Sequence, residues 1–100
     1  MEIQFDSAKS RANRRKHGLS LADAKRLDWD SMIAWIDDSQ DYGEERWVGI
    51  APLGRGRLHT VIFAEVDEET ARVISLRRST NQEARTYAAQ TGHKQTQVPT

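Results

Sequence analysis

The sequence predicts an α+β fold with a short N-terminal strand, two helices, a four-stranded antiparallel meander and a C-terminal helix. Runs rich in Val, Ile, Phe and Trp follow one another through residues 32–78 with short connections, which favours antiparallel neighbours. Helix-capping patterns flank this region, at residues 6–27 and 79–90. One hundred residues suffice for one domain, which we place at residues 1–90, with the helices on one face of the sheet.

Two helices are predicted before residue 28, each with its own start signal. The first covers Ala8–His17, between an N-cap and a C-terminal glycine. A capping box opens the second, shorter helix, and apolar residues at helical spacing continue it to Leu27. A short alternating strand precedes both. The signals are Ile3 and Phe5 for the strand, Asp6 or Ser7 with Gly18 for the first helix, and Ser20 with Asp23 for the second.

Four strands and a final helix are predicted for the remainder. Each strand is a β-prone run, and the connection Leu53–Gly56 is of hairpin type. A capping box at Thr80 or Ser79 opens the last helix, which we expect to reach Gln90. Residues 91–100 are polar and are expected to form a flexible tail. The predicted strands are Met32–Asp37, Glu45–Pro52, Arg57–Val66 and Ala71–Arg78.

The last strand and the helix after it form the stretch most suggestive of a binding site. Strict alternation would put one set of side chains on the core face and leave Ser75 and Arg77 on the other. A strand that delivers cations into a helix start favours an anion site, because free amides there add positive potential. Solvated arginines at a sheet edge are an equally good interpretation. The predicted faces are Arg72, Ile74, Leu76 and Arg78 toward the core, and Val73, Ser75 and Arg77 away from it.

Net charge is zero, but the charges are clustered along the chain. The blocks are 1–26 with +4, 27–45 with −7, 46–60 with +3, 61–70 with −4 and 71–100 with +4. Local fields of this kind steer partners even when the total charge vanishes. Basic patches could therefore hold RNA, and the acidic block Asp28–Glu45 could dock a basic segment of another protein.

Composition excludes several kinds of site. Without cysteine the chain has no disulfides, thiolate nucleophiles or Cys-based zinc sites. His17, His59 and His93 lack ligand spacing, so we expect no metal and no cofactor. No apolar run reaches membrane-spanning length and the N-terminus does not resemble a signal peptide, so a cytoplasmic protein without a membrane partner is expected.

Five short motifs carry a resemblance to a known family. They are Asn13-x-x-Lys16-His17-Gly18, Glu44-Glu45-Arg46-Trp47, Gly56-Arg57-Leu58, Arg72-Val73-Ile74-Ser75-x-Arg77-Arg78 and Glu83-Ala84-Arg85-Thr86-Tyr87. In this order they resemble the BrnT toxins of bacterial type II toxin–antitoxin pairs, whose fold is similar to that of the RelE ribonucleases. The resemblance covers nearly the whole chain up to Tyr87.

This resemblance implies a function and a set of partners. The chain would be a metal-independent endoribonuclease that cleaves RNA and halts translation. A BrnA-like antitoxin, which is a ribbon-helix-helix DNA-binding protein, would neutralise it, and their complex would repress the operon. Operator DNA would then be bound only through the antitoxin, and a homodimer within the complex is a further expectation.

RNA cleavage without a metal needs a base for the 2′-hydroxyl, an acid for the leaving oxygen and cations on the phosphate. Arginine suits the phosphate because its fork matches two oxygens, and histidine titrates near neutral pH. We expect antiparallel pairing to bring four arginines together, of which Arg77 is the strongest candidate. The predicted catalytic residues are His17, Glu45, Arg46 and Arg77, and the predicted RNA-binding residues are Lys16, Arg57, Arg78 and Tyr87.

Ordinary structural roles compete with several of these assignments. The competing roles are a helix-end cation for His17, a salt bridge to Arg46 for Glu45, a helix-start cation for Arg78 and core packing for Tyr87. The chain also departs from the family pattern at four positions, which are Phe5, Ala64, Val66 and Leu76. A catalytically inactive BrnT-like protein that binds the antitoxin as a co-repressor is therefore the alternative function.

Overall fold

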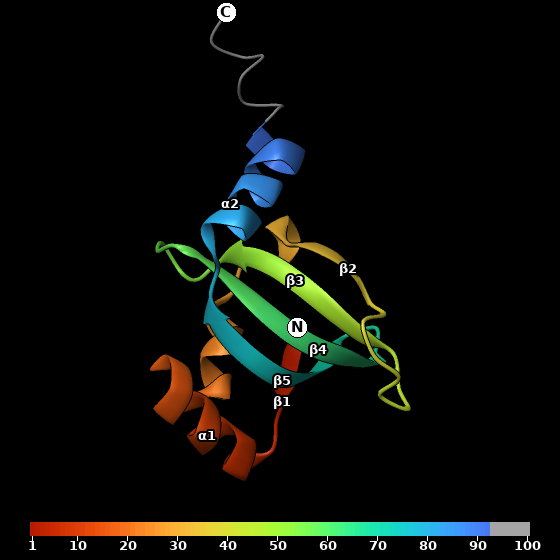
Figure 1. The fold of residues 1–100 in the computed structure, drawn as a ribbon. Coiled ribbons are helices and arrows are strands. Elements are labelled where there is room, and N and C mark those ends of the chain that lie inside the picture. The colour runs from red at the N-terminus through yellow and green to blue at the C-terminus, as the bar shows by residue number, and fades with distance from the viewer. Residues whose placement is uncertain (93–100) are drawn as a thin grey trace, which may run out of the picture.

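A five-stranded mixed sheet forms the centre of the computed structural model, which describes residues 1–92 (Figure 1). The strand order is β1-β5-β4-β3-β2. Strands β2 to β5 form the expected antiparallel meander. β1 adds a fifth strand, parallel to the start of β5, so the meander is part of a larger sheet. The strands are β1 (Glu2–Gln4), β2 (Ile33–Asp37), β3 (Arg46–Pro52), β4 (Leu58–Asp67) and β5 (Thr70–Arg78).

The first helix, α1 (Ser7–His17), has the caps that its sequence predicts. The Asp6 side chain accepts a hydrogen bond from the Lys9 amide at 2.9 Å. Gly18 ends the helix with φ +79°, a left-handed conformation that a glycine adopts without steric cost. Four basic residues fill the last turn, where the helix dipole favours positive charge.

The other helical segments differ from their predictions in type or length. The second predicted helix is a 3₁₀-helix, η1 (Leu21–Arg26), with the expected capping box, and a second 3₁₀ turn, η2 (Trp29–Ser31), follows it. The final helix, α2 (Asn81–Tyr87), continues past Gln90 as a π-helical turn, η3 (Ala88–Gly92). The predicted polar tail lies, from residue 93 on, outside the described residues. No helix among the first 92 residues is both long and apolar enough to cross a membrane.

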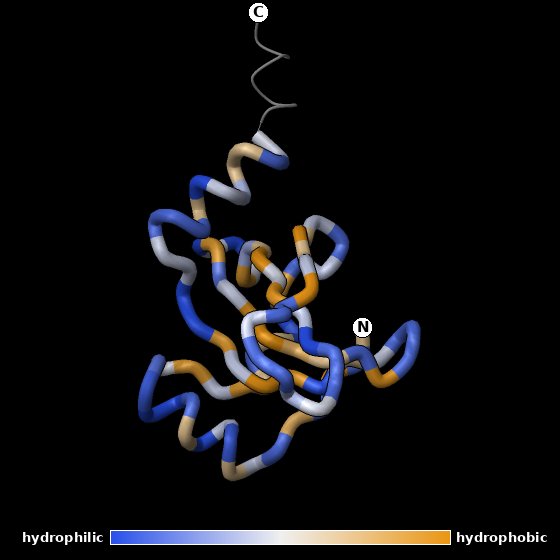
Figure 2. The backbone as a smooth tube through the Cα atoms, turned by 45° about the vertical axis from the view of Figure 1, so that its right-hand side comes forward, coloured by the Kyte–Doolittle hydropathy of each residue, from blue (hydrophilic) through white to orange (hydrophobic). Residues whose placement is uncertain are grey.

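The hydrophobic core lies between one face of the sheet and the segments that join α1 to β2. Figure 2 shows hydrophobic residues concentrated along the central strands and hydrophilic residues along most of α1. Trp29 of η2 covers this face, with its ring edge-to-face against Phe63 at a centroid distance of 5.2 Å. The buried apolar residues of this core are Ile3, Leu21, Ala24, Leu27, Ala51, Leu53, Val61, Phe63, Ala71, Val73 and Leu76.

A β-bulge in β5 corrects the predicted faces of this strand. Ile62 pairs with Ser75 and Phe63 pairs with Val73, so Ile74 is an extra residue. Because a bulge resets the alternation of side chains, Val73 and Leu76 both enter the core. The prediction that Ile74 would share the core face with Leu76 was therefore wrong, and Val73 takes its place.

Polar contacts attach α1 to the body of the protein. Its two buried residues are Ser10 and Asn13. The Ser10 hydroxyl accepts a hydrogen bond from the Leu21 amide at 2.9 Å. The Asn13 amide group donates to the Leu76 carbonyl at 2.8 Å and accepts from the Leu76 N–H at 3.1 Å. Asn13 thus pairs with β5 as a neighbouring strand would, beyond the point where β1 ends.

Candidate functional site

Five of the predicted site residues come together where α1 and β5 end. Lys16 and His17 form the last turn of α1, and Arg77 and Arg78 end β5. Arg57 stands directly before β4, whose residue His59 pairs with Arg78. Ser79 also donates its N–H to the Leu58 carbonyl at 3.0 Å, which holds this corner together. The ends of α1 and β5 and the start of β4 thus place five basic residues in this part of the fold.

A groove of about 220 Å³ runs between α1 and β5 beside this corner. We call it the α1–β5 groove. Its lining residues are Lys9, Ala12, Asn13, Lys16, His17, Ile74 and Ser75. Two lysines and no carboxylate line it, so it presents a positive field to an anion. Sequence reasoning missed Lys9 and Asn13 as members of the site, although their spacing to Lys16 and His17 on a helix puts all four on one face.

The His17 imidazole is half-buried in this groove. Partial burial, and then the positive charges of Lys16 and Arg77, lower its pKa below the ordinary 6.5. A lowered pKa favours the neutral imidazole, which is the form that can accept a proton. The same neighbours disfavour the competing role of a charged helix-end residue.

Arg77, the strongest candidate for a phosphate cation, is paired with Glu83 of α2. Its two terminal nitrogens lie 2.7 and 2.8 Å from the two carboxylate oxygens. This fork, with a further hydrogen bond from the Thr80 amide, lowers the pKa of Glu83 to about 2. Hydrogen bonding to Glu83 also raises the pKa of Arg77. The pair fixes the start of α2 against the end of β5 and leaves the Arg77 side chain 33% exposed.

Arg46 and Glu45 do not join this corner. Across the sheet, Ile50 of β3 pairs with Thr60 of β4, and Thr60 pairs with Arg77 of β5. Arg46 stands four residues before Ile50, so it lies toward the opposite end of the sheet from Arg77. Four residues of strand span roughly 13 Å. The expectation that strand pairing would unite all four arginines was therefore wrong for Arg46.

The partners of Arg46 also differ from those expected. Its Nε lies 3.5 Å from a Glu44 oxygen, and its guanidinium lies 4.1 Å from the centre of the Tyr42 ring. Arg72 binds the other oxygen of Glu44. Glu45 is exposed and forms no ion pair within residues 1–92, so the salt bridge considered for Glu45 is made by Glu44 instead.

Tyr87 is turned toward the 3₁₀ turn η2. Its hydroxyl donates to the Ser31 carbonyl at 2.9 Å, and the side chain is half-buried. This contact joins α2 to the segment that precedes β2. It agrees with the structural alternative for Tyr87, in which the ring packs and the hydroxyl is bonded at the rim.

The departures from the family pattern fall mainly on packing positions. Leu76 is fully buried, Ala64 is 4% exposed and Phe5 packs against the core. Val66 is exposed at the far end of β4. None of these four residues is among those that line the α1–β5 groove.

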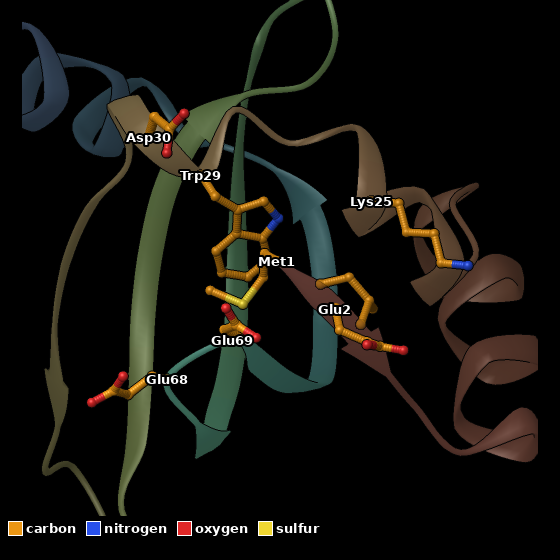
Figure 3. Close-up of a pocket in the computed structure, with 8 residues that line it drawn as sticks. Met1, Glu2, Lys25, Trp29, Asp30, Glu68 and Glu69 are labelled. Atoms are coloured by element: carbon orange, nitrogen blue, oxygen red, sulfur yellow. The ribbon is translucent and has the colours of Figure 1, made fainter.

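A second cavity, on the core side of the sheet, has the wrong charge for RNA. It measures about 740 Å³ and surrounds Trp29 on the core side of the sheet. Figure 3 shows the Trp29 ring between Asp30 on one side and Met1 and Glu69 on the other. Its lining includes four acidic side chains and one lysine, beside the N-terminal residue Met1; these are Glu2, Asp30, Glu68, Glu69 and Lys25. Phosphate groups would be repelled there, so the α1–β5 groove is the better candidate site.

Comparison with known proteins agrees with the motifs. Residues 5–83 match the family model described as the ribonuclease toxin BrnT of a type II toxin–antitoxin system. The fold is similar to the 1.1 Å crystal structure of the Brucella abortus ribonuclease toxin BrnT, with a TM-score of 0.60 and 29% sequence identity. That match covers 81% of this chain and 99% of the Brucella chain. Comparison with curated proteins gives no significant match.

Proposed function

The chain belongs to the BrnT family of ribonuclease toxins of type II toxin–antitoxin systems, and we propose that it cleaves RNA in the α1–β5 groove without a metal ion. The observation that carries this proposal is the position of His17 in a groove that two lysines line. His17 can accept a proton at pH 7, and Lys9 and Lys16 line the same groove. A base and fixed positive charges are what attack by a 2′-hydroxyl on the neighbouring phosphorus requires.

In the proposed reaction, His17 takes the proton from the 2′-hydroxyl. The freed 2′-oxygen bonds to phosphorus and the bond to the 5′-oxygen of the next nucleotide breaks, leaving a cyclic phosphate. The leaving oxygen takes up a proton from water. Lys16 and the exposed part of Arg77 stabilise the charge that builds on the phosphate oxygens, while Arg57 and Arg78 hold the RNA backbone on either side. Glu45 and Arg46 lie too far away to act in this step.

The proposal includes the partner and place of action expected for such a toxin. A type II system pairs the toxin with an antitoxin protein. We propose a BrnA-like ribbon-helix-helix antitoxin that neutralises the toxin and carries it to operator DNA. RNA cleavage would then halt translation in the cytoplasm whenever the antitoxin is lost.

Expression in bacteria tests this function. We expect growth arrest and fragmented RNA when the chain is expressed alone, and normal growth when the adjacent reading frame is expressed with it. His17→Gln should abolish the arrest, whereas the matched exposed variant Glu45→Gln should leave it intact. Arrest by His17→Gln equal to that of the wild type would remove His17 from the reaction.

One observation favours a second candidate function. Both oxygens of Glu83 occupy the Arg77 fork that would otherwise grip a phosphate. An inactive chain that serves only as an antitoxin-binding co-repressor would show this arrangement. Intact RNA and normal growth, together with operator binding by the complex, would identify that function.

A further inference from the structure

The outer edge of β2 is unusually apolar for a strand that ends a sheet. In the described part of the chain β2 pairs with β3 alone. Its sequence is Ile-Ala-Trp-Ile-Asp, and Trp35 and Ile36 are 39% and 46% exposed. Soluble proteins usually protect such edges with lysine, proline or a bulge. β2 has none of these, so its edge remains a template for another strand.

Both faces beside this edge are apolar. Trp35 pairs with Val48, which pairs with Ile62 on the open face of the sheet. Ile36 pairs with Trp47, which packs against the core on the other face. Figure 1 shows β2 at the margin of the sheet, with α1 near the opposite margin. A strand added to β2 could therefore bury apolar side chains on both of its faces.

The opposite edge of the sheet is closed to such an addition. β1 covers the first part of β5, and the Asn13 side chain occupies the backbone groups of Leu76 farther along. The outer edge of β1 is three residues long, which is too short to hold a further strand. The two edges are thus unequal, and β2 is the one suited to a partner.

Charge around β2 indicates which partner would fit. Residues 27–45 contain seven acidic residues and no Lys or Arg. A second copy paired antiparallel at β2 would bring the acidic loop after Asp37 beside Asp28 and Asp30 of its neighbour, which is repulsive. A strand flanked by Lys or Arg would instead be attracted.

We propose that β2 is the docking edge for an extended segment of the antitoxin, with alternating apolar residues and basic residues at its ends. The inference rests on the proposed function only in taking the antitoxin as the source of this segment. Three strands would separate the added strand from β5, which is four inter-strand spacings or roughly 19 Å. The added strand would anchor the antitoxin without itself filling the groove.

Single lysine substitutions test the edge. The probe is the protein encoded by the adjacent reading frame, co-purified with the full chain and then separated from it for titration. We expect Trp35→Lys and Ile36→Lys to weaken binding at least tenfold, measured by titration calorimetry. Val66→Lys is the matched control, because Val66 is 48% exposed on β4, and its affinity should stay within twofold of the wild type. Circular dichroism of each variant shows whether the fold is intact.

Three results would overturn the proposal. Equal affinity of the β2 variants and Val66→Lys would show that the partner binds elsewhere. A dimer of the isolated chain in ultracentrifugation that Trp35→Lys dissociates would make a second copy the occupant. Absence of any complex with the wild type would remove the antitoxin as the source. RNA cleavage by Trp35→Lys is assayed separately, and we expect it to equal that of the wild type. This assay tests the ribonuclease function independently of antitoxin binding.

Discussion

Neutralising Glu83 should destabilise the fold in a pH-dependent way. The pKa of this carboxyl falls from an ordinary 4.5 to about 2, chiefly because its oxygens accept hydrogen bonds from Arg77. A difference of about 2.5 pKa units corresponds to roughly 3.4 kcal/mol. The side chains of Arg77 and Glu83 are 33% and 20% exposed, so solvent screening reduces this to about 2 kcal/mol.

The direction of the effect follows from the depressed pKa. The ionised carboxylate stabilises the protein above pH 4.5, and that contribution disappears as the pH falls toward 2. Glu83→Gln removes it at every pH. We therefore expect the free energy of unfolding of the variant to be about 2 kcal/mol below that of the wild type at pH 7. The difference should be less than half as large at pH 3 and close to zero at pH 2.

Urea unfolding followed by tryptophan fluorescence at pH 7, 4 and 3 measures the free-energy difference between variant and wild type and its dependence on pH. Glu45→Gln is the control, because Glu45 is exposed and unpaired in the part of the chain that the structure describes, and it should match the wild type at each pH. A Glu83→Gln deficit that stays constant between pH 7 and pH 3 would refute the reasoning. So would equal stability of variant and wild type at pH 7.

Three further changes test other parts of the molecule. Asn13→Ala should lower the free energy of unfolding by about 2–4 kcal/mol, because it leaves the N–H and C=O of Leu76 without partners. A loss below about 1 kcal/mol, measured by urea unfolding, would contradict this role of Asn13. Gly49→Ala should cost about 1–3 kcal/mol because its new Cβ would collide with the Met32 sulfur, and thermal unfolding should show a smaller cost in a Met32→Ala background. His17→Gln should slow RNA cleavage about 100-fold, and since the pKa of His17 is lowered, the acidic limb of the wild-type pH–rate profile should lie below 6.5.

Local signals predicted the elements well because they act within a few residues. The Asp6 cap, the Gly18 stop and the Thr80 capping box all occur as the sequence indicates. Each depends on hydrogen bonds between residues three or four positions apart. The 3₁₀ character of η1 and the π turn after Tyr87 were not predictable in this way, because tertiary contacts select among helical forms.

Long-range geometry limited the prediction of the site. The bulge at Ile74 inverts the faces of half a strand, and no residue type announces it. The register of β3 against β4 places Arg46 far from Arg77, which cannot be read from the alternation within either strand. Glu83 was predicted only as part of a cap, and its salt bridge depends on how α2 leaves β5. The resemblance to BrnT toxins supplied the function, and the structure then separated the candidates by position.

The inequality of the two sheet edges also bears on solubility. Fibre growth by strand pairing requires two unpaired sheet edges on each molecule, because each added molecule must offer a new edge to the next. Here a single asparagine side chain, that of Asn13, occupies the backbone of β5 at one margin. Strand pairing at β2 therefore ends once one partner strand is added, because the other margin offers no second site. Asn13→Ala would add a receptive margin, so slow aggregation at high protein concentration should accompany its loss of stability.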